Sequence, residues 1–188
     1  MTRRVMVLPL ILVAALLSTG CGYNTMQTLD EQVNQAKGNI QAQLQRRADL
    51  IPNLVNTVKG FAAQEQEIFT EVANARSRLA GAVQTGDVGD MAEANAALSA
   101  PLSRLLAISE AYPELKSDQN FMQLQDELTG TENRISVARQ DYNAAVSEFN
   151  AYIRRFPQNL TAKVFGLSEP REYFEAEPGA TDVPKVQF

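Results

Sequence analysis

Apolar residues recur every three or four positions along most of the chain, which is the spacing of one face of an α-helix. The first of these stripes runs from Leu29 to Leu79 and keeps its phase past Pro52. Proline lacks an N–H donor and usually interrupts a helix. We therefore expect residues 28–83 to form either one helix kinked near Pro52 or two nearly collinear helices that meet there.

The same spacing predicts two further long helices and a short one. A turn is expected at 85–89, where the sequence TGDVG contains two glycines. The helix that follows carries an interruption at Pro101. The most regular stripe lies between Phe121 and Phe156, and a short helix is expected at 160–165.

The alternating pattern of strands and the close turns of hairpins are missing from the sequence. The pattern therefore predicts an all-α fold. The architecture that it favours is an antiparallel bundle of three long helices, the first broken or kinked near Pro52, plus a short C-terminal helix.

The first twenty residues have a different pattern. Arg3 and Arg4 precede an apolar run at 5–17, and small residues then lead to Cys21. This is the order of a secretory signal, and the run is shorter than the roughly 20 residues that span a bilayer. The residues before Cys21 resemble a bacterial lipobox, in which the cysteine is acylated and becomes the mature N-terminus. A single N-terminal transmembrane helix is the alternative topology.

Cys21 is the only cysteine of the chain, so a disulfide framework is excluded. Lipidation explains why an exported protein would contain a single unpaired cysteine. Each buried acyl methylene contributes about 0.8 kcal/mol, so several acyl chains hold a domain firmly on a membrane. We expect a membrane-anchored protein outside the cytoplasm, on the periplasmic or extracellular face, and at the outer membrane if the host has one.

Without residues 1–20 the chain keeps 15 basic and 22 acidic residues, a net charge of −7. Such a domain is a poor partner for nucleic acid, and the acyl anchor is its expected attachment to the membrane. The predicted organisation is a signal peptide at 1–20, a lipidated tether at 21–27, a helical bundle domain at 28–168 and a flexible tail at 169–188.

The chain contains no histidine. The usual base for a serine or cysteine nucleophile and the usual ligand of a zinc or di-iron site are therefore missing. Glu127 and Glu132 are five residues apart and point to different sides of a helix. We predict a non-enzymatic protein with no catalytic residue, metal, cofactor or identified small-molecule substrate. An envelope enzyme or accessory factor of unknown substrate is the alternative.

Several separate stretches carry a family resemblance. They are RRADLIPNLV at 46–55, LSRLLAISEAYPELK at 102–116, NFMQLQDELTGTENRISVARQDYNAAVSEFN at 120–150 and RRFPQNLTAKVFG at 154–166. In this order they resemble the bacterial LemA family. The resemblance implies a helical domain held on the envelope by a membrane segment or a lipid anchor, and a family without an established enzymatic activity.

The polar residues of these motifs form the candidate site. Three of them on the last long helix, Arg139, Asn143 and Asn150, are separated by four and seven residues and share one side. We hypothesise that they meet polar groups of the first helix in a layer beside Pro52, formed by Arg47, Asp49 and Asn53. The full set of candidates is Arg46, Arg47, Asp49, Pro52, Asn53, Asn133, Arg134, Arg139, Tyr142, Asn143 and Asn150.

A long helical domain on a tether offers its surface to another envelope protein or to a second copy of itself. The alanine-rich face at 92–100 is one such surface, with ordinary close packing as the alternative. The sequence therefore favours a lipid-anchored helical scaffold or protein-interaction module.

Overall fold

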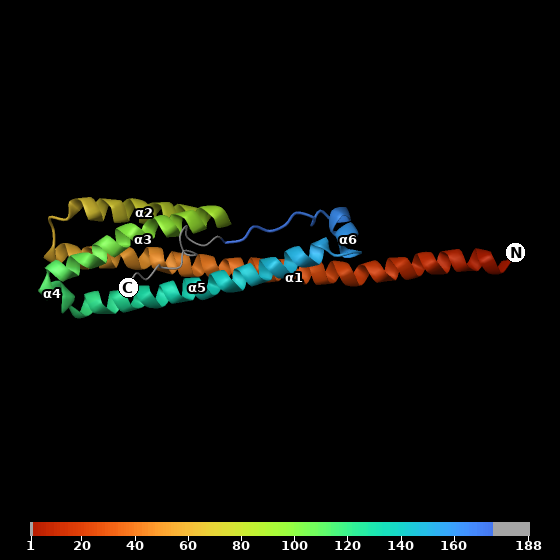
Figure 1. Cartoon of the computed structure of the whole chain (residues 1–188), viewed down its shortest axis with the longest axis horizontal. Helices are drawn as coiled ribbons and strands as arrows, with labels where there is room; N and C mark the ends of the chain where they lie inside the picture. The colour runs from red at the N-terminus through yellow and green to blue at the C-terminus, as the bar shows by residue number, and fades with distance from the viewer. Residues whose placement is uncertain (1, 175–188) are drawn as a thin grey trace, which may run out of the picture. The chain divides into compact units, whose positions relative to one another are not determined.

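The structure is a computed structural model that describes the backbone of residues 2–174 and the side chains of residues 22–174. No strand occurs in this range, so the predicted all-α class is confirmed. The helices are α1 (Thr2–Phe61), α2 (Gln66–Thr85), α3 (Val88–Ala111), α4 (Pro113–Lys116), α5 (Gln119–Arg154) and α6 (Gln158–Val164) (Figure 1).

The chain divides into two compact units, and both α1 and α5 contribute to each of them. The smaller unit combines Met1–Ala36 with Asp141–Glu172. The larger unit combines Lys37–Gln140 with the segment that starts at Tyr173.

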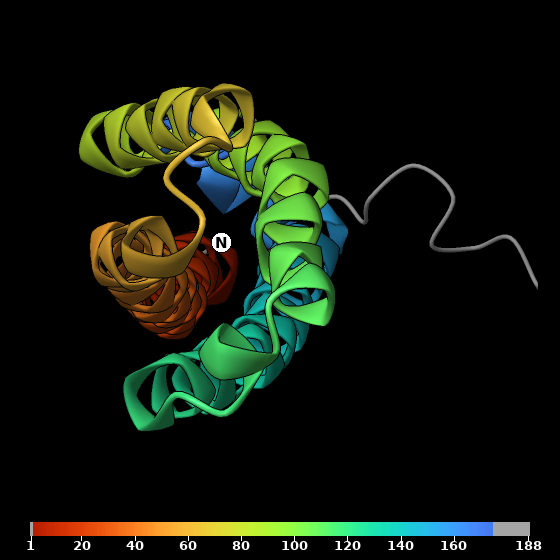
Figure 2. The same cartoon turned by 90° about the vertical axis from the view of Figure 1, so that its left-hand side faces the viewer.

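In the larger unit, α2 packs along α3, and the two helices lie side by side in Figure 2. The apolar stripes predicted from the sequence supply its core. Leu44 and Ile51 on α1, Leu79 on α2, Leu98 on α3 and Phe121 on α5 are all buried. Burial of these side chains, rather than helix propensity, stabilises the arrangement.

A helix boundary at Pro52, one of the two expected alternatives, is wrong. The backbone stays helical through Pro52, and α1 ends only at Phe61, before residues 62–65 lead into α2. Residues 28–83 thus belong to two helices, with the boundary further along the chain. Pro52 lacks the N–H that would bond to the carbonyl of Ala48, but Nε of Arg76 on α2 donates to that oxygen at 3.1 Å. This bond offsets part of the free energy that the missing N–H of Pro52 costs the helix.

Two other expected boundaries are also wrong. In the segment predicted as a tether at 21–27, residues 22–27 are helical within α1, and Met26 is fully buried there. The helix α3 continues through Pro101 without a restart. Leu98 and Leu102 are buried on either side of this proline, and their packing outweighs its low helix propensity.

Local signals in the sequence set three of the helix ends. The side chain of Asp118 accepts a hydrogen bond from the N–H of Phe121 at 2.9 Å, which caps α5 just before the predicted stripe begins at Phe121. The side chain of Asp87 caps α3 by accepting from the N–H of Asp90. Gly86 ends α2 with a φ of 70°. The turn lies at residues 86–87, inside the range predicted at 85–89.

In the smaller unit, α1 and the end of α5 bury apolar side chains such as Val33, Val146, Phe149 and Ile153. Ala162 is buried on α6. Within the described part of the chain, no helix combines the length and the apolar composition that a membrane crossing needs.

Candidate functional site

Arg47 is buried in the core of the larger unit, where only 6% of it is exposed. Its Nη1 lies 2.5 Å from Oδ1 of Asn95 on α3 and 2.7 Å from Oε2 of Glu132 on α5. Burying a charge is costly unless it is paired and hydrogen-bonded. One guanidinium group therefore connects three helices, and we call these residues the Arg47 cluster.

The sequence predicts Arg47 as a site residue but not its two partners. Asn95 stands among alanines, on the same helical face as the buried Met91 and Leu98. A polar residue at such a core position signals a buried hydrogen bond. Glu132 carries no comparable signal, because half of its side chain is exposed.

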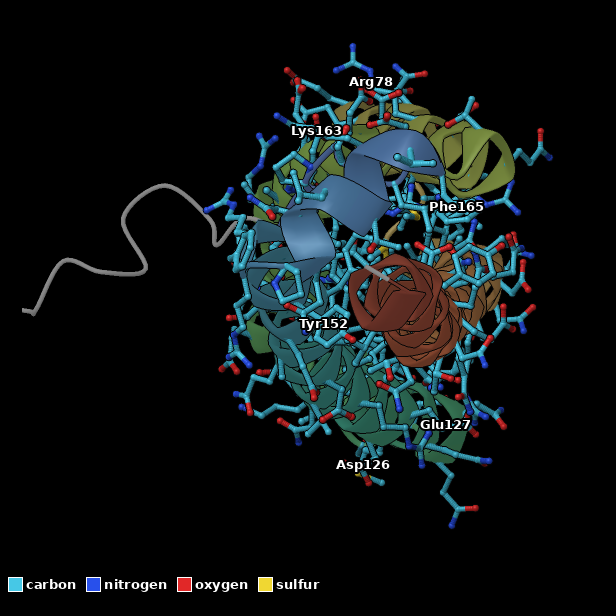
Figure 3. All side chains as sticks on the ribbon, turned by 90° about the vertical axis from the view of Figure 1, so that its right-hand side faces the viewer. Arg78, Asp126, Glu127, Tyr152, Lys163 and Phe165 are labelled. Carbon is cyan, nitrogen blue, oxygen red and sulfur yellow. The ribbon has the colours of Figure 1, made fainter. Side chains whose placement is uncertain are left out.

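Arg46 lies beside Arg47 in the sequence but is exposed, and it lines an open groove between α1 and α5 in the larger unit. Its Nη2 lies 3.8 Å from Oε2 of Glu127. This part of the groove has a volume of about 480 Å³, and Arg134 and Asp126 also line it. Figure 3 shows the side chains of Asp126 and Glu127 at the outer surface of α5.

A second hollow of about 390 Å³ adjoins the first, because Gln123 lines both. Its lining is rich in amide and hydroxyl groups: Asn53, Asn56, Thr57, Asn120 and Gln123, with Leu124. We call the two hollows together the α1–α5 groove. Three of the predicted site residues line it, namely Arg46, Asn53 and Arg134.

Asp49 and Asn53 do not belong to a buried layer, so that part of the polar-layer hypothesis is wrong. Both residues are exposed, and Asp49 accepts a hydrogen bond from Nε2 of Gln45, one turn earlier on α1, at 2.8 Å. The reason is their position on the helix. Ala48 and Ile51 face the core, which turns the stripe that contains residues 49 and 53 toward solvent.

Asn150 is buried in the smaller unit and binds the main chain of Arg171 twice. Its Nδ2 donates to the carbonyl of Arg171 at 2.9 Å, and its Oδ1 accepts from the N–H of Arg171 at 2.8 Å. The guanidinium of Arg171 then reaches Asp30, with Nη2 2.6 Å from Oδ1. We call Asp30, Asn150 and Arg171 the Arg171 cluster.

The segment 169–174 is therefore not a flexible tail, as the sequence predicts, because its polar main-chain groups bind α5. The hydroxyl of Tyr142 donates to the carbonyl of Glu172 at 2.9 Å. In the larger unit, Phe174 is buried, and the guanidinium of Arg139 lies 5.2 Å from the centre of its ring. Residues 175–188 lie outside the described residues.

The remaining predicted residues differ in exposure. Asn133 and Arg134 are exposed, and Asn143 is half-buried. Cys21, the predicted lipidation site, lies outside the residues whose side chains the structure describes. Among the side chains that are described, no three of the types His, Cys, Asp and Glu gather into a metal site.

The structure defines a class of protein: an all-helical protein in which buried arginine and asparagine side chains connect helices and an open polar groove follows two of them. The comparison with known proteins places it more closely. The chain belongs to the LemA family, whose sequence model matches residues 36–188. The resemblance found in the motifs is confirmed.

Individual relatives agree with this assignment. The chain is 30% identical to magnetosome protein MamQ 2 of Paramagnetospirillum magneticum, over 87% of this chain and 68% of the relative. It is 28% identical to magnetosome protein MamQ of Magnetospirillum gryphiswaldense, with the same coverage. It is 23% identical to protein LemA of Metamycoplasma hominis, over 85% of this chain and 72% of the relative.

Proposed function

We propose that this protein is a non-enzymatic, lipid-anchored protein of the bacterial cell envelope, and that its helical domain is a scaffold or protein-interaction module. The observation that carries the interaction role is the α1–α5 groove. The antiparallel bundle expected from the sequence is part of the proposal, with α1 and α2 taking the place of the broken first helix.

The chemistry of the groove fits a polar protein partner. Amide side chains such as Asn120 and Gln123 both donate and accept hydrogen bonds, as a partner's main chain does. At one end Arg46 and Arg134 lie with Asp126 and Glu127, so both signs of charge are available to select a partner. An open, solvated groove of this kind suits reversible association better than a closed substrate site.

The support for the anchor comes from the N-terminal sequence. Cys21 is the only cysteine, and a signal-like segment precedes it. Two of the relatives described above are named magnetosome proteins. These names support the proposal that the present chain acts within an assembly.

The anchor is tested by growing cells with an alkyne-labelled fatty acid and determining the mass of the N-terminal peptide. We expect an acylated peptide that begins at Cys21, and no label on the variant Cys21→Ser. An unlabelled chain that keeps residues 1–20 and stays in the membrane fraction would contradict lipidation and support a spanning segment instead.

The interaction role is tested with a photo-crosslinking amino acid at Gln123, inside the groove. Gln84 is the matched control, because it is an exposed glutamine on α2 outside the groove. We expect Gln123 to capture one envelope protein or a second copy of this chain reproducibly, and Gln84 to capture neither. Equal capture at the two positions, or none at either, would overturn the groove as the interaction surface.

A further inference from the structure

The apolar side chains of α6 and its flanks are unusually exposed. Of the eight large hydrophobic residues exposed in the described chain, four lie within 156–165. They are Phe156, Leu160, Val164 and Phe165, with exposed fractions of 79%, 54%, 78% and 55%, and we call them the α6 patch.

The α6 helix carries apolar side chains on two sides. Leu160 and Val164 lie one turn apart on the same side of it, whereas Ala162 is buried. Exposed apolar side chains that cluster on a surface mark a site of interaction with a protein or a membrane.

The start of the predicted mature chain adjoins this patch within the smaller unit. The hydroxyl of Tyr152 donates to the carbonyl of Gly22 at 3.3 Å, and the ring of Tyr23 lies 4.5 Å from the ring of Phe165. Figure 3 shows Tyr152 and Phe165 on two sides of the N-terminal part of α1. The residue that follows Cys21 is therefore held against the end of α5 and beside α6.

The charge around the patch differs from that of the whole chain. Residues 149–168 contain Arg154, Arg155 and Lys163 and no acidic residue, although the chain without residues 1–20 carries a net charge of −7. All three cations are exposed. The net charge of the chain argues against attraction to anionic lipid, but residues 149–168 are locally basic.

We propose that the α6 patch docks on the surface of the membrane that holds the anchor. Its apolar side chains enter the boundary between headgroups and acyl chains, and Arg154, Arg155 and Lys163 face anionic lipid phosphates. This inference rests on the proposed lipidation of Cys21, which brings the patch to the bilayer. A single acyl attachment leaves a domain free to rotate, whereas the second contact fixes which surface faces the membrane.

The chain contains no tryptophan, so one introduced tryptophan reports on its own position. The test uses the full chain with Leu160→Trp, processed in cells and reconstituted into vesicles of phosphatidylcholine and phosphatidylglycerol with brominated acyl chains. The matched control is Val137→Trp on α5, because Val137 is 56% exposed and Leu160 54%. We expect quenching by bromine to be several-fold stronger for Leu160→Trp, together with a blue-shifted emission.

The outcomes separate this inference from the anchor on which it rests. If the chain stays on the vesicles but both tryptophans are quenched equally weakly, the patch does not dock and the anchor stands. If the chain does not stay on the vesicles, both proposals are overturned. A blue shift that depends on protein concentration and not on brominated lipid would assign the patch to a second copy and overturn membrane docking.

A second comparison tests the role of the basic residues near the α6 patch. Adding Lys163→Glu to Leu160→Trp should weaken the quenching in vesicles that contain phosphatidylglycerol and leave it unchanged in vesicles of phosphatidylcholine alone. An equal effect in both kinds of vesicle would overturn the role assigned to anionic lipid.

Discussion

The Nε of Arg76 on α2 lies 3.1 Å from the main-chain oxygen of Ala48 on α1, and Pro52 explains why this oxygen is available. In an α-helix, the N–H of residue 52 would bond to the carbonyl of residue 48. Proline has no such N–H, so the carbonyl is free to accept from the neighbouring helix. Pro52 thus does not end α1 but gives α2 a hydrogen-bond acceptor on it.

A double-mutant cycle tests this relationship. Arg76→Met removes the donor and should lower the free energy of unfolding by about 1 kcal/mol. In a Pro52→Ala background the new N–H bonds to Ala48, so Arg76→Met should cost measurably less. Urea unfolding followed by circular dichroism gives the four values. An equal cost in both backgrounds would show that the proline and the arginine act independently.

The adjacent residues Arg46 and Arg47 should respond very differently to the same substitution. Arg47→Met leaves Asn95 and Glu132 without their buried partner, and we expect a loss of about 1–3 kcal/mol, because half of the Glu132 side chain reaches solvent. Arg46→Met removes only an exposed pair and should cost about 0–1 kcal/mol. Unfolding midpoints in urea report both, and similar losses would contradict the assignment of Arg47 to the core.

Asn150→Ala should loosen the attachment of the segment around Arg171 to α5, because it removes both hydrogen bonds to the main chain of Arg171. We expect a loss of about 1–3 kcal/mol in the free energy of unfolding, with faster cleavage at Arg171 by trypsin. Asn133→Ala, on the exposed side of the same helix, is the control and should change stability by less than about 0.5 kcal/mol. Unchanged proteolysis in Asn150→Ala would show that Asn150 does not hold this segment on α5.

Two glycine-to-alanine substitutions near the end of α2 should have opposite signs. Gly81 lies inside the helix with open space around it, so Gly81→Ala should raise stability by about 0.5–1 kcal/mol. Gly86 has a φ of 70°, and a Cβ there would lie 3.0 Å from Nε2 of Gln41. Gly86→Ala should lower stability by about 1–2 kcal/mol. Thermal melting of both variants checks the prediction, which fails if both change in the same direction.

The sequence predicts the buried polar residues only where they stand in a recognisable motif. Arg47 and Asn150 stand in recognisable motifs, and both prove to be buried and hydrogen-bonded. Their partners Asn95 and Arg171 are distant in the sequence, and no spacing rule connects them. The motif also predicts Asp49 in the same layer, which is wrong, because a motif shows which residues are adjacent in sequence but not which face of the helix is covered.

Local patterns in the amino-acid sequence are enough to predict the helical class, the stripe that starts at Phe121 on α5 and the turn after α2. These features depend on the spacing of apolar residues and on caps such as Asp118, which act within a few positions. Two other features depend on how the helices pack: α1 continues through Pro52, and the segment from Glu169 to Phe174 is held on the domain. Both outcomes depend on donors and acceptors brought together by packing, Arg76 with Ala48 and Asn150 with Arg171, and such pairs exist only once the helices have met.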